Sequence, residues 1–220
     1  MSTVAAVQTR GAAVDPETAA AVRAAFGRVV DEFDAFDPRS TIRRLGTCSD
    51  FGRPCWDFAF RLADETAGAF SPRWKGDGSL DFGAVAKGFA VDVAAAAVRT
   101  NGVAGLLIDL GGNLKAVRGD WTVGIRDGES FLLKEGEACA TSARYFRGRH
   151  IRDGRDGSDV GRDIHSVTVV HPSSALVADG LSTVLFVLGR EKGEAFLRRR
   201  YPDARAIWLS EDGTDGKDSK

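Results

Sequence analysis

The apolar and polar positions of this chain predict helices and short strands in a mixed order. One stretch organises the pattern. After the flexible Gly83, apolar residues recur at helical spacing and predict a helix from residue 84 to about residue 102, where Gly102 suits a left-handed cap: Val85, Phe89, Val93 and Ala96. An apolar strand over 106–110 follows, and then a turn built on Gly111 and Gly112. This loop, helix, strand and glycine turn form the centre of the predicted fold.

Helical periodicity predicts further helices on both sides of this centre. Asp15 and Pro16 have the character of an N-cap and a first helical residue, and an apolar stripe follows them: Val22, Phe26, Val29, Val30 and Phe33. Other helices are expected over 54–66, 175–188 and 191–200. Gly189 is expected to end the helix over 175–188. The run Arg198, Arg199 and Arg200 is expected to be a solvated helix end that suits the helix dipole.

Short apolar segments separated by Gly-Asp and Asp-Gly turns predict strands. They are expected over 4–8, 106–110, 114–117, 121–125, 131–134, 138–142, 166–170 and 204–209. Because hairpin-linked strands are mixed with helices, the predicted fold class is α+β. A single domain over 1–210 made of two merged lobes is expected, followed by a polar, disordered tail over 211–220.

Composition narrows the possible functions. A net charge of -1 over 220 residues gives no electrostatic reason to expect binding to nucleic acid. The sequence has no run of 18 apolar residues, so membrane insertion is not expected. Three cysteines without metal-type spacing are expected to be core or semi-exposed thiols in a reducing compartment, and the N-terminal residues do not resemble a signal peptide. A cytoplasmic location is therefore the expectation.

Backbone amides at the predicted helix start and at the turn of Gly111 and Gly112 are natural ligands for phosphate oxygens. Lys87 would add a point charge to a pyrophosphate. Most glycine-rich turns near a lysine are only turns, and the sequence has neither a Walker pattern nor the Rossmann glycine spacing. The segment is thus a candidate phosphate site, and the alternative is that it is an ordinary turn without a ligand.

Two other segments carry candidate chemistry. Asp179 and Thr183 lie four residues apart on an apolar helix, so their oxygens project from one face and suit Mg²⁺. The alternative is an acid in a first helical turn and a threonine bonded to a carbonyl. His150 and Asp153 lie in a polar loop, where the histidine would serve as a general base or would be an ordinary exposed side chain.

Several ordered segments resemble a known family. Asp-Phe-Gly-Ala-Val-Ala-Lys-Gly-Phe-Ala-Val-Asp at 81–92, followed by Ile-Asp-Leu-Gly-Gly-Asn at 108–113, resembles the signature of the ApbE family, the FAD:protein FMN transferases. Segments similar to that family's motifs also lie at 33–40, 66–72, 140–142, 150–157 and 178–189. The resemblance implies an ApbE-like, T-fold-related α+β fold of mostly antiparallel strands with packed helices, and a flavin and metal site between two lobes.

The resemblance also implies an activity. Such an enzyme cleaves FAD at its pyrophosphate, transfers FMN to a Thr or Ser hydroxyl of an acceptor flavoprotein, and releases AMP. Mg²⁺ would be the cofactor, FAD the substrate, and the protein a monomer or homodimer. By this resemblance the metal ligands would be Ala84 through its carbonyl, Asp179, Ser182 and Thr183.

The resemblance assigns the remaining site residues as well. His150 would be the catalytic base, with Asp153 beside it. FAD would contact Phe36, Ala69, Phe70, Ser71, Asp81, Lys87 and Ile151. For Phe36 the local aromatic pattern alone favours packing in the core instead of contact with the flavin.

This chain departs from the family pattern on the flavin and adenine side. Ala67 and Ser71 stand where the family has acids, Gly154 and Asp156 replace a proline and a threonine, and the segment between Pro72 and Leu80 is shorter. Three alternatives therefore stay open. One is a protein that binds or carries FAD without turnover, and another is a Mg²⁺-dependent FAD pyrophosphatase that gives FMN and AMP. The third is a family member without activity that acts in an assembly and binds no flavin.

Overall fold

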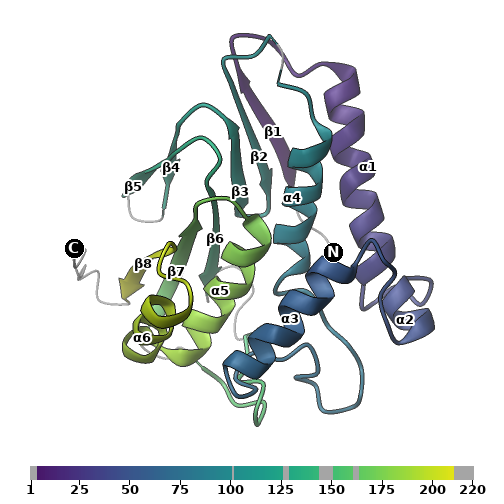
Figure 1. The fold of residues 1–220 in the computed structure, drawn as a ribbon, viewed down its shortest axis with the longest axis vertical. Helices are drawn as coiled ribbons and strands as arrows, with labels where there is room; N and C mark the ends of the chain where they lie inside the picture. Colours follow the sequence, from purple (N-terminus) through teal and green to yellow (C-terminus); the bar gives the residue numbers. More distant parts are fainter. Residues whose placement is uncertain (1–3, 101, 126–128, 144–150, 161–163, 211–220) are drawn as a thin grey trace.

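A computed structural model describes residues 4–100, 102–125, 129–143, 151–160 and 164–210 of the chain. The secondary structure confirms a mixed α and β composition (Figure 1). The elements in chain order are β1 Ala5–Arg10, α1 Pro16–Phe33, α2 Thr41–Leu45, α3 Arg53–Glu65, α4 Ala86–Ala97, β2 Gly105–Leu110, β3 Asn113–Arg118, β4 Trp121–Gly124, β5 Ser130–Leu133, β6 Ala138–Ala143, β7 Ile164–His171, α5 Ala175–Leu188, α6 Arg190–Arg200 and β8 Arg205–Ser210.

Six strands form one sheet in the order β1-β2-β3-β6-β7-β8, and every neighbouring pair is antiparallel. The strands β4 and β5 form a separate two-stranded hairpin. The N-terminal strand β1 pairs with β2 far along the chain, with Ala5 opposite Leu110. The predicted α+β class with mostly antiparallel strands is therefore confirmed.

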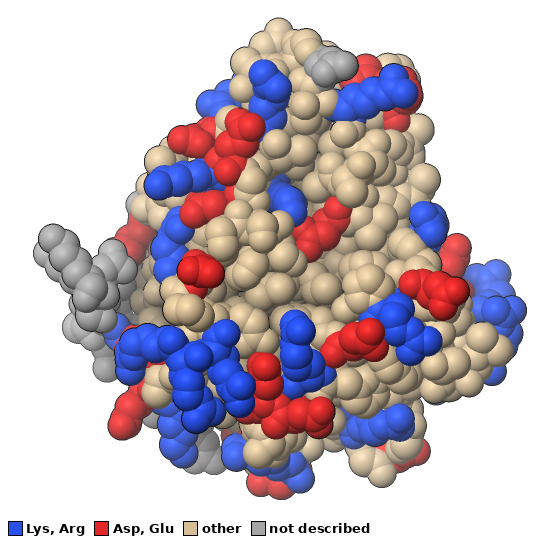
Figure 2. Space-filling model, viewed as in Figure 1, with Lys and Arg blue, Asp and Glu red and all other residues tan. Residues whose placement is uncertain are grey.

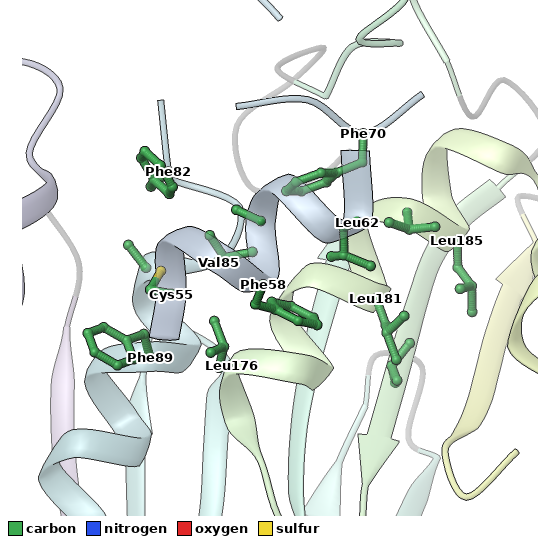
Figure 3. Close-up of a cluster of buried hydrophobic side chains, with 14 of the residues drawn as sticks. Cys55, Phe58, Leu62, Phe70, Phe82, Val85, Phe89, Leu176, Leu181 and Leu185 are labelled. Atoms are coloured by element: carbon green, nitrogen blue, oxygen red, sulfur yellow. The ribbon is translucent and has the colours of Figure 1, made fainter. Parts of the chain in front are cut away.

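The helices cover one side of this sheet (Figure 1). The helix α4 lies between α1 and α5, and α3 lies across the lower ends of α4 and α5. The main apolar core lies where these helices meet (Figure 3). Figure 3 shows Phe58 and Leu62 of α3 directed toward Leu181 of α5. A side chain at Gly180 would meet Phe58 and Leu62 at 2.7 Å, so the glycine allows these two helices to approach closely.

An aromatic cluster holds the segment that precedes α4. Phe82 is 1% exposed, and its ring stacks on Trp56 of α3 at a centroid distance of 5.3 Å. The ring of Phe33, at the end of α1, lies 4.8 Å from the same phenylalanine. Because burial of such rings dominates core energetics, Phe82 anchors the chain immediately before Lys87.

Most expected helix boundaries are confirmed by local contacts. Asp15 accepts a hydrogen bond from the Thr18 amide at 2.8 Å and caps α1, as its position before Pro16 predicts. The helix α4 is shorter than expected, because Val98 takes an extended backbone and ends the helix after Ala97. Gly102 has a positive φ of 81°, but it turns the chain toward β2 and caps no helix.

Four other expectations concern which residues are exposed or buried and whether a helix could span a membrane. Val30 is 38% exposed, so it does not belong to the buried stripe of α1. Arg198, Arg199 and Arg200 are exposed at the end of α6 as expected, and Figure 2 shows Lys and Arg side chains gathered over this helix at the lower left. None of the described helices is both long enough and apolar enough to span a membrane. The three cysteines are free thiols, and all of them are buried in the core and not semi-exposed.

Candidate functional site

The helices α4 and α5 approach each other closely at Gly88. A Cβ atom at this position would lie 2.1 Å from the carbonyl oxygen of Ala175 and 2.8 Å from Cβ of Asp179. Only a residue without a side chain fits between these backbones. The glycine therefore brings the start of α4 against the first turns of α5, which places Lys87 beside Asp179.

Asp179 is the centre of this contact. The residue is 4% exposed, and its carboxylate accepts a hydrogen bond from the Gly88 amide at 2.9 Å. The ammonium of Lys87 lies 3.0 and 3.2 Å from the two carboxylate oxygens, and it also donates to the carbonyl oxygen of Gly83 at 3.2 Å. Burial raises the pKa of Asp179, while the Lys87 charge and the Gly88 amide act in the opposite direction.

Two hydroxyl groups follow Asp179 on α5 and contact a third on the sheet. Ser182 donates to the carbonyl oxygen of Asp179 at 2.9 Å, and its Oγ lies 2.9 Å from Oγ of Ser142 on β6. Thr183 Oγ1 lies 3.5 Å from the same Ser142 oxygen. Ser142 had no assigned role in the sequence analysis, although the Ala-Thr-Ser segment at 140–142 marks it. It links the hydroxyls of α5 to the sheet.

The donor set at this place fits a hard cation. It offers one carboxylate from Asp179 and neutral hydroxyls from Ser182 and Thr183, and Ala84 lies in the turn before α4. Within the described residues no group of three or more His, Cys, Asp or Glu side chains gathers at one point. Mg²⁺ suits such a sparse site because it keeps waters and takes phosphate oxygens as its remaining ligands.

Phe36 and Asp81 lie in a second group. Phe36 is 82% exposed, so the prediction of core packing for this ring is wrong. The reason is the turn after α1, where the Asp34 carboxylate accepts the Phe36 amide at 2.9 Å outside the helix. Lys75 joins the two residues, since its ammonium lies 5.4 Å from the Phe36 ring centroid and 3.2 Å from the Asp81 carboxylate. Asp81 also accepts the Gly83 amide at 2.9 Å.

The loop that carries Asp153 packs on the segment from Ala69 to Ser71. Gly154 donates to the carbonyl oxygen of Ala69 at 2.9 Å, and a side chain at Gly154 would meet the Gly68 carbonyl at 2.5 Å. Ala69 and Phe70 are buried, whereas Ser71 is half-buried and accepts the Arg73 amide. The expected cofactor residues 69–71 thus meet the loop predicted to carry the base.

Asp153 is engaged by Arg155. Its carboxylate accepts the Arg155 amide at 3.0 Å and Nε at 2.8 Å, and it forms an ion pair with Nη2. This pairing lowers the pKa of Asp153, although burial opposes the shift. His150 lies outside the described residues, and Ile151 is half-buried against the main core.

The described residues of the predicted site therefore fall into three groups, and contacts join the residues within each group. Lys87 of α4 pairs with Asp179 of α5, and Ser182 and Thr183 of the same helix contact Ser142 of β6. Phe36 and Asp81 share Lys75, and residues 69–71 meet the loop of Asp153. The pairing of Lys87 with Asp179 was not predicted, because 92 positions separate them in the sequence.

Comparison with known proteins places these groups in a family context. A model of the ApbE family matches residues 73–208, which include Asp81, Lys87, Asp153 and Asp179. A protein from Klebsiella pneumoniae (strain 342) named FAD:protein FMN transferase is 38% identical over 146 residues, covering 60% of this chain and 45% of that protein. A protein of the same name from Treponema pallidum (strain Nichols) is 34% identical over 161 residues, covering 60% and 44%.

The chain spans about half the length of these curated relatives. Solved structures agree in fold. The flavin transferase ApbE from Vibrio cholerae superposes with a TM-score of 0.77 at 19% identity, covering 96% of this chain and 93% of that one. The apo form of the Pseudomonas stutzeri flavinyl transferase ApbE gives a TM-score of 0.77 at 21% identity, covering 97% and 93%. With a family model over more than half of its residues and this fold, the chain belongs to the ApbE family.

Proposed function

We propose that this chain supports Mg²⁺-dependent transfer of FMN from FAD to a Thr or Ser hydroxyl of an acceptor flavoprotein, with release of AMP. The names of its relatives favour flavin transfer. The observation that carries the proposal is the buried Asp179 carboxylate, which lies against Lys87 and the Gly88 amide. Ser182 and Thr183 follow it on α5 within about one helical turn. These groups supply what a metal-bound pyrophosphate requires.

The residues at the contact of α4 and α5 would bind the metal and the pyrophosphate. Asp179, Thr183, Ser182 and the Ala84 carbonyl would hold the metal, which would neutralise charge on the pyrophosphate and on the departing AMP. Lys87 now bonds both Asp179 oxygens, and its flexible stem lets the ammonium reach a phosphate oxygen instead. Most of the rate would come from positioning and electrostatics.

The other groups would bind the ends of the substrate and the acceptor. Phe36 presents an exposed ring suited to stacking on a flavin, and Asp81 lies next to it through Lys75. Residues 69–71 and Ile151 would line the flavin or adenine pocket, and His150 would deprotonate the acceptor hydroxyl. Because Asp153 is engaged by Arg155, we assign it to shaping this loop more than to proton transfer.

The decisive experiment is mass spectrometry of a Thr-containing flavoprotein domain incubated with the protein, FAD and Mg²⁺, with AMP measured in parallel. A mass gain of one FMN phosphoester together with AMP supports transfer. AMP and free FMN without a modified acceptor would indicate a pyrophosphatase, and bound FAD without AMP would indicate a carrier. Asp179→Asn should abolish AMP formation, whereas Asp15→Asn, which alters a helix cap at α1, should not.

A further inference from the structure

The N-terminus of α5 is capped by a carboxylate from another helix. Asp92 of α4 accepts the Ala175 amide at 3.0 Å on Oδ1 and the Leu176 amide at 3.0 Å on Oδ2. Its Oδ2 also accepts the hydroxyl of Ser174 at 2.8 Å. Free amides at a helix start need such partners, and an acid is favoured there by the helix dipole.

A lysine of the sheet fixes this carboxylate. Lys115 of β3 donates to Oδ1 of Asp92 at 2.7 Å and to the carbonyl oxygen of Ser173 at 2.5 Å. The side chains of Lys115 and Asp92 are only 16% and 22% exposed, so water screens this ion pair less than one on the surface. The contact joins α4, α5 and β3 at one point.

Each of the two helices thus places a carboxylate at the start of the other. Asp179 of α5 binds the start of α4 at Gly88, and Asp92 of α4 binds the start of α5 at Ala175. Ala175 is also the residue whose carbonyl oxygen lies against Gly88. Since Ala175 and Asp179 are one helical turn apart, a slide of α5 at its start moves the Asp179 carboxylate by a similar amount.

We propose that Asp92, held by Lys115, is a positioning residue that sets where Asp179 meets Gly88 and Lys87. This inference rests on the proposed function for its catalytic meaning. The Gly88 amide lies 2.9 Å from Asp179, and such bonds extend to about 3.2 Å, so a slide of a fraction of an ångström is enough to weaken it. Asp92 acts through α5 and is not a catalytic residue.

The test compares Asp92→Asn with Asp15→Asn. Both variants remove a charged helix cap, but Asp15 caps α1 through the Thr18 amide. Asp92→Asn is expected to accelerate hydrogen exchange of the Gly88 amide by about tenfold and to weaken Mn²⁺ binding by about tenfold, the lower range for residues that support metal ligands. Asp15→Asn is expected to leave both readouts within about twofold of wild type, because the amide oxygen of asparagine caps a helix about as well as a carboxylate does.

An unchanged Gly88 exchange rate in Asp92→Asn would overturn the proposal, and so would equal acceleration in Asp15→Asn. Lys115→Met is a milder second variant that keeps the carboxylate, and it should change Gly88 exchange in the same direction. Hydrogen exchange needs neither metal nor FAD. If wild-type protein fails to bind Mn²⁺, the proposed metal site is refuted, and the exchange rates still decide the role of Asp92.

Discussion

Replacing Gly88 by alanine tests the geometry on which the site depends. An alanine Cβ would lie 2.1 Å from the Ala175 carbonyl oxygen, where ordinary contacts begin at 3.4 Å. The helices would have to separate by about 1.3 Å, because the obstructing atoms are backbone and cannot rotate away. That movement would break the 2.9 Å bond between the Gly88 amide and Asp179.

The expected loss in the free energy of unfolding of Gly88→Ala follows from three effects. Overpacking costs about 1–3 kcal/mol, and leaving a buried hydrogen-bonding group without its partner costs about as much again. Alanine gains about 1 kcal/mol over glycine in helix propensity. The free energy of unfolding should therefore fall by about 3 kcal/mol, which for a domain of this size lowers the melting temperature by roughly 6–12 °C.

Gly27 provides a matched control within α1. Apart from its chain neighbours and the adjacent backbone of α1, no heavy atom lies within 4 Å of a Cβ built at this position, so Gly27→Ala gains helix propensity without a clash. It should raise the melting temperature by roughly 2–4 °C. Urea denaturation and thermal melting of both variants measure the difference. A Gly88→Ala protein as stable as Gly27→Ala would refute the close approach of α4 and α5.

Three further predictions concern other parts of the molecule. Phe82→Ala should cost about 3–5 kcal/mol in urea denaturation, whereas Phe36→Ala, at an 82% exposed position, should change stability by less than about 0.5 kcal/mol. Burial raises the pKa of Cys139 to about 12, so a thiol reagent should find no reactive cysteine before urea unfolds the chain. Burial also lowers the pKa of His171 from 6.5 while Asp92 and Asp203 oppose the shift, and its Nδ1 accepts the amides of Ser173 and Ser174. Because the unfolded chain then binds the proton more readily, thermal stability should fall as the pH drops below about 6.5, and His171→Gln should reduce that loss.

Local signals were sufficient for most of the helices and strands. The predicted helix over 175–188 has the bounds of α5, because an apolar run there ends at Gly189, whose φ is 81°. The five-residue helix α2 was missed, since so short a segment holds little more than one turn of periodicity. The order of the sheet was beyond prediction, because β1 finds its partner β2 about a hundred residues away.

The candidate site was predictable as residues but not as an arrangement. The four-residue spacing of Asp179 and Thr183 identified the α5 side of the site. That Lys87 bonds this aspartate depends on Gly88 fitting against Ala175, a contact between helices far apart in the sequence. The prediction that Phe36 packs in the core was wrong. The turn at Asp34 ends the helical periodicity of α1 and directs Phe36 away from the core.

The pairing of β1 with β2 has a consequence for biosynthesis. A ribosome makes Ala5 about a hundred residues before Leu110, its partner in the sheet. During that interval β1 has an unpaired backbone on both edges, and an exposed strand edge can pair with other chains. Bringing β1 and β2 together closes a loop of about a hundred residues, and the entropy of this loop is lost before the contact between the strands adds stability. Protection of this strand from aggregation is therefore a requirement while the chain is being made.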